Sequence, residues 1–173
     1  MTASLNPVLQ ALQDRLGAQP CDFCGDPSLM IGPLQTHEAA RMLRDEFGFE
    51  MLTDETASDY WPQENPRFHV VYNFTSIKHR LRLSLRVPVY GQNPTIPSIE
   101  SIYPNANWFE REIWDLFGIR FEGHSDLRRI LMPSDWVGHP LRKDYPLGYE
   151  EPQFSFNFDE IDRRKPHGGL EEA

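Results

Sequence analysis

Strict alternation of apolar side chains with other side chains constrains the fold of this 173-residue chain most. In residues 68–75 and 81–89 every second position is apolar, and the second stretch places Arg82, Ser84 and Arg86 in between. Because successive side chains of a β-strand point to opposite faces of its sheet, this period predicts two strands with one buried face. The other face is expected to meet water or a partner, and another layer must cover the apolar face.

Two upstream segments have the pattern of one-sided helices, which could supply that layer. The first has Asn6 as a candidate cap, Pro7 at the first helical position and Gly17 at its end. The second is expected to begin at Thr36 and to stop at Gly48. Each carries an apolar stripe at helical spacing, so each needs a sheet to lie on.

The remaining sheet elements are shorter. Strands are predicted at 20–24, 28–31 and 49–53, with loops at 59–65 and 91–97. The order of elements is therefore helix, two strands, helix, three strands. It predicts an α+β fold, a two-layer domain with helices on one face of a five-stranded mixed sheet.

The pattern changes in the last third of the chain. A third helix is expected with Asn107 as its cap, Glu110 at the capping-box position and Gly118 just beyond its end. The rest shows little periodicity, with at most one helical turn near 126–131. We therefore expect an α+β domain in residues 1–120 and a largely irregular, extended C-terminal segment in residues 121–173 that packs on partner proteins.

Composition restricts the classes of function. No apolar run approaches the 18 or more residues of a membrane-spanning helix, and the N-terminus does not resemble a signal peptide, so a soluble, cytoplasmic protein is expected. The net charge of −9 argues against nucleic-acid binding by the whole chain. Residues 67–99 nevertheless contain five bases and no acid, a basic strip that could match an acidic partner.

A nucleic-acid module remains an alternative for this strip. It would use the strand that carries Arg80, Arg82 and Arg86, with Phe68 and Tyr72 as groups on which bases stack.

Cysteine usage gives little support to a redox or metal centre. Cys21 and Cys24 form the one C-x-x-C pair, whereas iron–sulfur clusters and structural zinc usually need four such ligands. A thioredoxin-like pair would open a helix, but these residues lie in a predicted strand. Small buried hydrophobic residues are the simpler interpretation.

Residues 110–144 concentrate charges of both signs among large aromatic side chains. A solvated face is the ordinary explanation of such a run. An active site is a second alternative, with Asp115 and either His124 or His139 as a base and its orienting partner, or as metal ligands. The chain contains no nucleophile elbow, phosphate loop or dinucleotide fingerprint. The mixture favours a contact surface in which arginines bind carboxylates and carbonyl groups.

Three linked strings make this region specific. They are Glu110 to Ile119 (EREIWDLFGI), Gly123 to Leu131 (GHSDLRRIL) and Gly138 to Pro146 (GHPLRKDYP). In this order they resemble the C (thirty-kilodalton) subunit family of respiratory complex I. The family usually has proline at the position of Ser125, and this departure is expected to loosen one turn. A related module of membrane-bound hydrogenases is the nearest competing family.

The resemblance implies a non-catalytic scaffold subunit of the hydrophilic arm of NADH:quinone oxidoreductase, without an active site or cofactor of its own. Flavin, iron–sulfur clusters and quinone would be carried by other subunits. The implied partners are the quinone-pocket (D-type) subunit and the adjacent iron–sulfur (B-type) subunit, peripheral on the cytoplasmic side of the membrane. The implied contact residues are Arg111, Glu112, Asp115, His124, Asp126, Arg128, Arg129, His139, Arg142, Lys143 and Asp144.

The tail contains three phenylalanines at a spacing of two, Phe154, Phe156 and Phe158. Burial of each ring would contribute roughly 1.5–3 kcal/mol, enough to offset the ordering of a short segment. We expect these rings to contact a partner as an assembly strap. Folding back on the chain's own sheet is the alternative.

Overall fold

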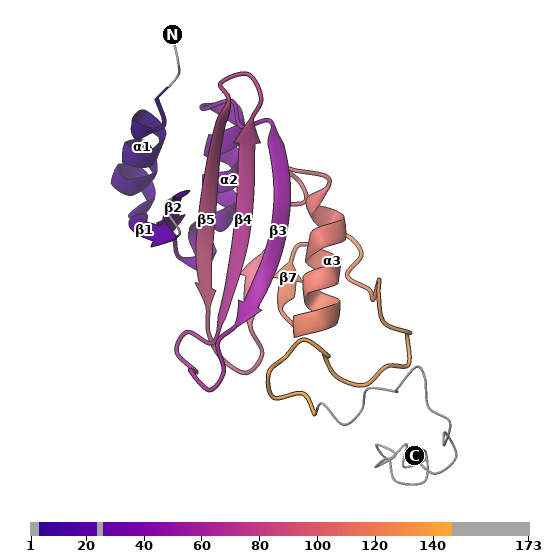
Figure 1. Ribbon diagram of the computed structural model, residues 1–173. Helices are drawn as coiled ribbons and strands as arrows, with labels where there is room; N and C mark the ends of the chain where they lie inside the picture. The colour runs from indigo at the N-terminus through magenta and orange to yellow at the C-terminus, as the bar shows by residue number, and fades with distance from the viewer. Residues whose placement is uncertain (1–3, 24–25, 147–173) are drawn as a thin grey trace, which may run out of the picture. The chain divides into compact units, whose positions relative to one another are not determined.

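The computed structural model describes residues 4–23 and 26–146. Its main element is a five-stranded sheet in the order β1-β2-β5-β4-β3 (Figure 1). The strands are β1 (Gln19–Phe23), β2 (Asp26–Met30), β3 (Met51–Asp59), β4 (Phe68–Ser76) and β5 (Leu81–Val89). β2 and β5 are parallel and the other neighbours are antiparallel. The predicted five-stranded mixed sheet of an α+β fold is confirmed.

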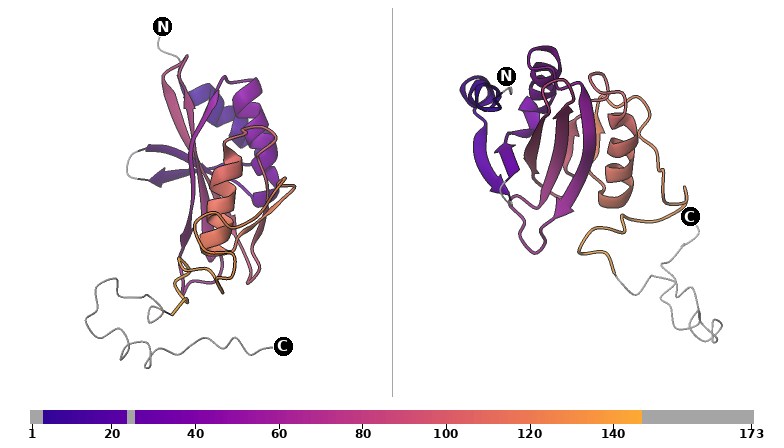
Figure 2. Two further views of the ribbon diagram at one scale, coloured as in Figure 1. Left: turned by 90° about the vertical axis from the view of Figure 1, so that its right-hand side faces the viewer. Right: turned by 45° about the horizontal axis from the view of Figure 1, so that its top comes forward.

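Three helices cover one face of the sheet, as Figure 2 shows from the side. They are α1 (Asn6–Leu16), α2 (Thr36–Asp45) and α3 (Ala106–Phe117). Burial alternates along β4, where Phe68, Val70, Tyr72 and Phe74 face the helices and are at most 1% exposed. The period-two pattern therefore identified the buried face correctly. The same pattern excludes a nucleic-acid module that stacks bases on Phe68 and Tyr72, because both rings lie within the core, away from the face that carries Arg82.

Several predicted boundaries were wrong. β3 continues to Asp59, through the start of the expected loop, because eight of its nine residues pair along β4. The expected loop at 91–97 contains β6 (Thr95–Pro97), which pairs in parallel with β7 (Arg120–Glu122). A 3₁₀ turn, η1 (Pro33–Gln35), precedes α2.

The two expected asparagine caps were also wrong. Asn6 and Asn107 lie inside α1 and α3, and the preceding cap positions form no side-chain cap bond. Glu110 does not close a capping box, because its buried carboxyl accepts hydrogen bonds from Ser98 Oγ at 2.6 Å and from the N–H of Ile99 at 2.7 Å.

Residues 123–146 contain no helix or strand. The chain divides into two compact units, residues 1–143 and 144–173, and β7 spans the position at which the sequence suggested a division. Of the second unit the structure describes residues 144–146. None of the helices in the described ranges has the length and apolar character that crossing a bilayer requires.

Candidate functional site

Asp115 in α3 organises the irregular segment that follows the helix. Its buried carboxylate accepts hydrogen bonds from the N–H groups of Ile130, Leu131 and Met132 at 3.0, 2.8 and 2.8 Å. Arg129 completes the set through a short ion pair with the same carboxylate. Burial alone would raise the pKa of Asp115, but these donors together hold it below its ordinary value. The carboxylate therefore fixes a turn of the main chain, and these donors already occupy its oxygens.

Arg129 acts as a second organising group. Its guanidinium donates to the carbonyl oxygens of Asp115, Trp136 and Gly138 at 3.3, 2.8 and 3.0 Å. It also lies 5.8 Å from the centroid of the Trp114 ring. One planar fork thus connects α3 with two points of the segment, which a lysine could not do.

Arg111 binds the same turn from the preceding part of α3. Its guanidinium donates to the carbonyl oxygens of Arg128 and Arg129 at 3.2 and 3.3 Å and lies 5.1 Å from the Trp108 ring centroid. The side chain of Arg111 is buried, at 8% exposure. Two of its N–H donors thus bind the main chain of the segment.

His139 and Arg142 close the segment over the end of α3. His139 Nδ1 lies 3.0 Å from the carbonyl oxygen of Asp115, and Arg142 Nε donates to the carbonyl oxygen of Phe117 at 2.6 Å. Gly118, in the left-handed region at φ +74°, lets the imidazole approach, since a Cβ there would lie 2.5 Å from it. Burial lowers the pKa of His139. The main chain, rather than the Asp115 carboxylate, is the partner of this histidine.

His124 has a separate role at the start of the segment. Its Nε2 lies 3.1 Å from the carbonyl oxygen of Asn107, and its Nδ1 accepts from the N–H of Asp126 at 3.0 Å. Ser125 donates from its N–H and its hydroxyl to Glu100 at 2.8 and 2.7 Å. A proline at this position could not donate the first of these bonds. The serine was expected to loosen this turn, and that expectation was wrong, because its two hydrogen bonds to Glu100 hold the turn in place.

The acid–base pair that the sequence left open as an alternative is not assembled. Four donor groups occupy the carboxylate of Asp115. His139 forms its hydrogen bond with the main-chain carbonyl oxygen of Asp115 and not with the carboxylate, and His124 lies beside the carbonyl oxygen of Asn107. Within residues 4–23 and 26–146, no group of three or more His, Cys, Asp or Glu side chains is arranged to hold a metal ion. Cys21 is half-buried in β1, whereas Cys24 lies outside the described residues.

The other expected contact residues point to solvent. Glu112, Asp126, Arg128 and the Lys143 side chain are exposed, and Asp126 and Arg128 form a surface pair at 2.9 Å. The N–H of Lys143 donates to Asp59, which also pairs with buried Arg67. Asp144 begins the second unit. Phe154, Phe156 and Phe158 lie outside the described residues.

The sequence did not indicate which large apolar side chains of residues 108–143 are exposed. Four large side chains on α3 and the following segment are exposed: Trp108 59%, Leu131 60%, Val137 76% and Leu141 48%. They have no common period, so only the three-dimensional arrangement of the turns shows that they are exposed. Together with the exposed charges they form what we call the outer surface of residues 108–143.

An α+β domain that uses several ionic side chains to hold its own main chain, while large apolar side chains stay exposed, has the character of an interaction module. Comparisons with known proteins agree. Residues 29–151 match the model of the respiratory-chain NADH dehydrogenase 30 Kd subunit family. The C subunit of NADH-quinone oxidoreductase from Roseiflexus sp. (strain RS-1) is 49% identical over 147 residues, 84% of each chain. Its counterpart from Geobacter sulfurreducens is 40% identical over 148 residues, covering 84% of this chain and 91% of the relative.

Two solved structures share the fold. The trypsin-resistant fragment of Nqo5 matches with a TM-score of 0.64 and 32% identity, covering 71% of this chain and 98% of the fragment. A chain of an archaeal membrane-bound sulfane sulfur reductase matches with a TM-score of 0.65 and 19% identity, covering 97% and 93%. The latter shows similarity of fold alone. The chain belongs to the 30 Kd (C) subunit family of respiratory-chain NADH dehydrogenase.

Proposed function

We propose that this chain is a scaffold subunit of the hydrophilic arm of proton-translocating NADH:quinone oxidoreductase and supports its quinone-reducing module. It has no active site or redox cofactor of its own in this proposal, and flavin, iron–sulfur clusters and quinone belong to other subunits. It sits peripherally on the cytoplasmic side of the membrane. Its family membership and the outer surface of residues 108–143 support this role.

The main support for the proposal is that residues 108–143 direct one set of ionic side chains inward and leave large apolar side chains exposed. Arg111, Asp115, Arg129 and Arg142 use their polar groups on the chain itself, which holds an irregular segment in one shape. A surface prepared in this way loses little conformational entropy on binding. Burial of its exposed apolar side chains would contribute roughly 1.5–3 kcal/mol each before the costs of association.

The proposed partners are the quinone-pocket (D-type) subunit and the adjacent iron–sulfur (B-type) subunit. Apolar side chains would supply affinity, and the exposed charges Glu112, Asp126 and Arg128 would supply register. The tail phenylalanines Phe154, Phe156 and Phe158 would extend the contact as a strap.

Purification of the tagged full-length chain from membranes in mild detergent tests this function. We expect it to bring NADH:quinone oxidoreductase activity and both proposed partners with it. Val137→Asp, at a side chain 76% exposed, should reduce their recovery. Leu34→Asp, at a side chain 82% exposed in η1 and outside residues 108–143, is the matched control and should not.

Recovery of the chain alone would refute the proposal, and so would tightly bound iron or flavin in the isolated chain. Recovery with the subunits of a hydrogenase would favour the related module instead.

A further inference from the structure

Two hollows lie near the turn between β4 and β5: the smaller one on the sheet face opposite the helices, and the larger one beside it, where Leu5, just before α1, and Leu81 also line it. Their volumes are about 300 Å³ and about 700 Å³, and both are lined by Pro27, Thr75 and Arg82. Pro27 belongs to the β1–β2 hairpin, which turns away from the helices toward this face (Figure 2). The shared residues place the two hollows next to each other beside Arg82, and we call them together the groove.

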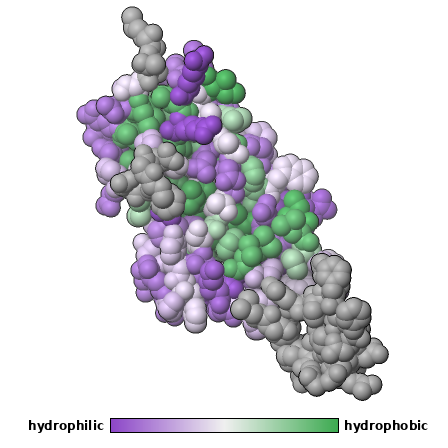
Figure 3. Space-filling model, in the orientation of Figure 1, coloured by the Kyte–Doolittle hydropathy of each residue, from purple (hydrophilic) through white to green (hydrophobic). Residues whose placement is uncertain are grey.

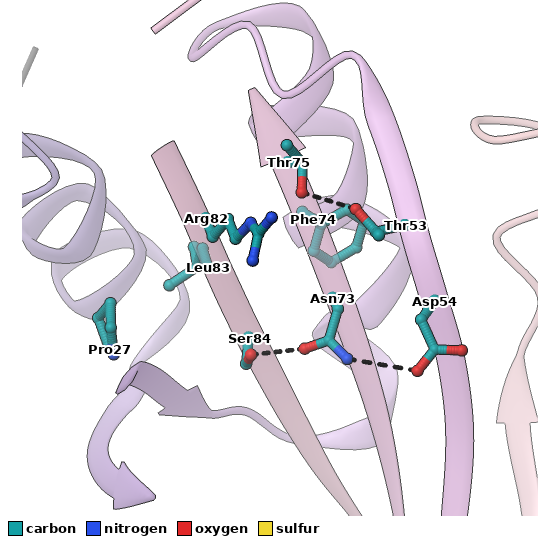
Figure 4. A pocket seen from close by; sticks show the side chains of 9 residues that line it. All are labelled: Pro27, Thr53, Asp54, Asn73, Phe74, Thr75, Arg82, Leu83 and Ser84. Atoms are coloured by element: carbon teal, nitrogen blue, oxygen red, sulfur yellow. Dashed lines mark hydrogen bonds between the residues drawn. The ribbon is translucent and has the colours of Figure 1, made fainter. Parts of the chain in front are cut away.

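The smaller hollow has a polar floor whose groups bind each other, as Figure 4 shows. Ser84 Oγ donates to Asn73 at 2.6 Å, and Asn73 Nδ2 in turn donates to Asp54 at 3.5 Å. The hydroxyls of Thr53 and Thr75 lie 2.6 Å apart. Most of this floor is therefore satisfied without a ligand.

The larger hollow combines apolar and basic side chains. Leu5, Ile77 and Leu81 line it together with Arg80 and Arg82, and Ile77 is 65% exposed. In Figure 3, hydrophilic and hydrophobic residues lie side by side at this end of the face. Arg80 has φ +55°, a conformation uncommon for a residue with a side chain.

Three basic side chains gather at this end of the sheet, and the carboxylate of Asp54 lines the smaller hollow together with one of them, Arg82. Lys78, Arg80 and Arg82 form no ion pair within the described residues. The carboxylate of Glu50 is close, but it accepts from the N–H groups of Ile77 and Lys78 at 2.8 and 3.0 Å. At the opposite end of the same face, by contrast, Arg86 donates to the hydroxyl of Tyr60 at 2.8 Å.

We propose that this groove is a docking site for an acidic segment of a neighbouring subunit, distinct from the outer surface of residues 108–143. One apolar side chain of that segment would enter the larger hollow against Ile77 and Leu81. Flanking carboxylates would bind Arg80 and Arg82, whose forked donors suit carboxylates. This inference rests on the proposed role as a subunit of a larger assembly.

A photo-cross-linking residue at position 77 tests the inference in the assembled, detergent-purified complex. The expected adduct joins position 77 to a different subunit, at a segment with two or more Asp or Glu residues beside an apolar one. Arg80→Glu with Arg82→Glu should lower the adduct yield roughly fivefold or more, because it replaces attraction by repulsion. Arg80→Lys with Arg82→Lys should retain most of it.

Arg15→Glu with Arg41→Glu is the matched control, since both arginines are exposed outside the groove and outside residues 108–143, and the change in charge is the same. It should leave the yield unchanged. Three adduct results would overturn the inference: no adduct in an intact complex, an adduct to a second copy of this chain or to lipid, and an adduct to a segment without acids. Equal yields in the charge-reversed variant and the control would also overturn it. Recovery of the unmodified chain without any partner would instead overturn the proposed function itself.

Discussion

The sheet and the segment that follows α3 are ordered by different means. In β4 and β5 apolar side chains alternate into a core from which water is excluded. In residues 123–143 the side chain of His124 is buried, but no residue is buried as a whole. Hydrogen bonds from side chains of α3 to the main chain of the segment nevertheless hold it at many points. The sheet owes its order to the area that it buries, whereas the segment depends on a few ionic side chains. A substitution in the segment should therefore disturb its structure locally, whereas a substitution in the sheet should lower the stability of the whole domain.

Asp115→Ala should produce the largest effect, and it should be local. Removal of one partner of a buried ion pair costs about 3–5 kcal/mol, and the N–H groups of Ile130, Leu131 and Met132 lose their acceptor as well. Hydrogen exchange at these three amides should accelerate roughly a hundredfold or more, since each 1.4 kcal/mol is a factor of ten. Unchanged protection at these amides would show that the segment does not depend on the carboxylate.

Leu85→Ala should produce the second largest effect, and it should be global. Leu85 is fully buried in β5, and such a truncation costs about 2–5 kcal/mol. The urea midpoint of the whole domain should fall, with protection lost evenly over β3, β4 and β5. Loss confined to residues 123–143 would contradict the contrast between the two regions.

The buried carboxyl of Glu110 should make the free energy of unfolding of the domain depend on pH. Burial raises its pKa from 4.5 to about 7, although Ser98 and Ile99 donate to it. A carboxyl whose pKa is raised on folding contributes stability below its unfolded pKa, and this contribution is lost as the pH rises through the folded value. The free energy of unfolding should therefore fall by about 2–3 kcal/mol between pH 4.5 and pH 8 on account of this group.

Glu110→Gln is the matched variant, because it keeps acceptors for Ser98 and Ile99 without titrating. Its stability should vary less with pH than that of the unmodified chain. Burial lowers the pKa values of His69 and His139, which act with the opposite sign below pH 6.5, so the difference between the two proteins is the quantity to measure. Equal pH profiles would contradict the role of this carboxyl.

The same contrast explains what the sequence could predict. β4 and β5 were predictable because burial imposes a period of two on their residues. The role of Asp115 was not, because its bonds reach main-chain groups 15 to 17 positions away, which any residue type supplies. The resemblance marked Asp115, Arg129 and His139 as important, but composition and spacing could not tell inward residues from outward ones. The pairing of β6 with β7 was missed because three residues are too few to establish a period.

Asp126→Ala with Arg128→Ala should have the smallest effect on folding, although these residues lie beside the turn that Asp115 fixes. Their ion pair is 2.9 Å long, but the side chains are 55% and 71% exposed, and such pairs contribute about 0–1 kcal/mol. Amide protection at residues 130–132 should therefore be unchanged. If the pair serves a partner, recovery of neighbouring subunits with the tagged chain should nevertheless fall. Loss of recovery with intact protection would separate the outward charges from the inward ones, whereas loss of both would place Asp126 and Arg128 among the groups that hold the segment.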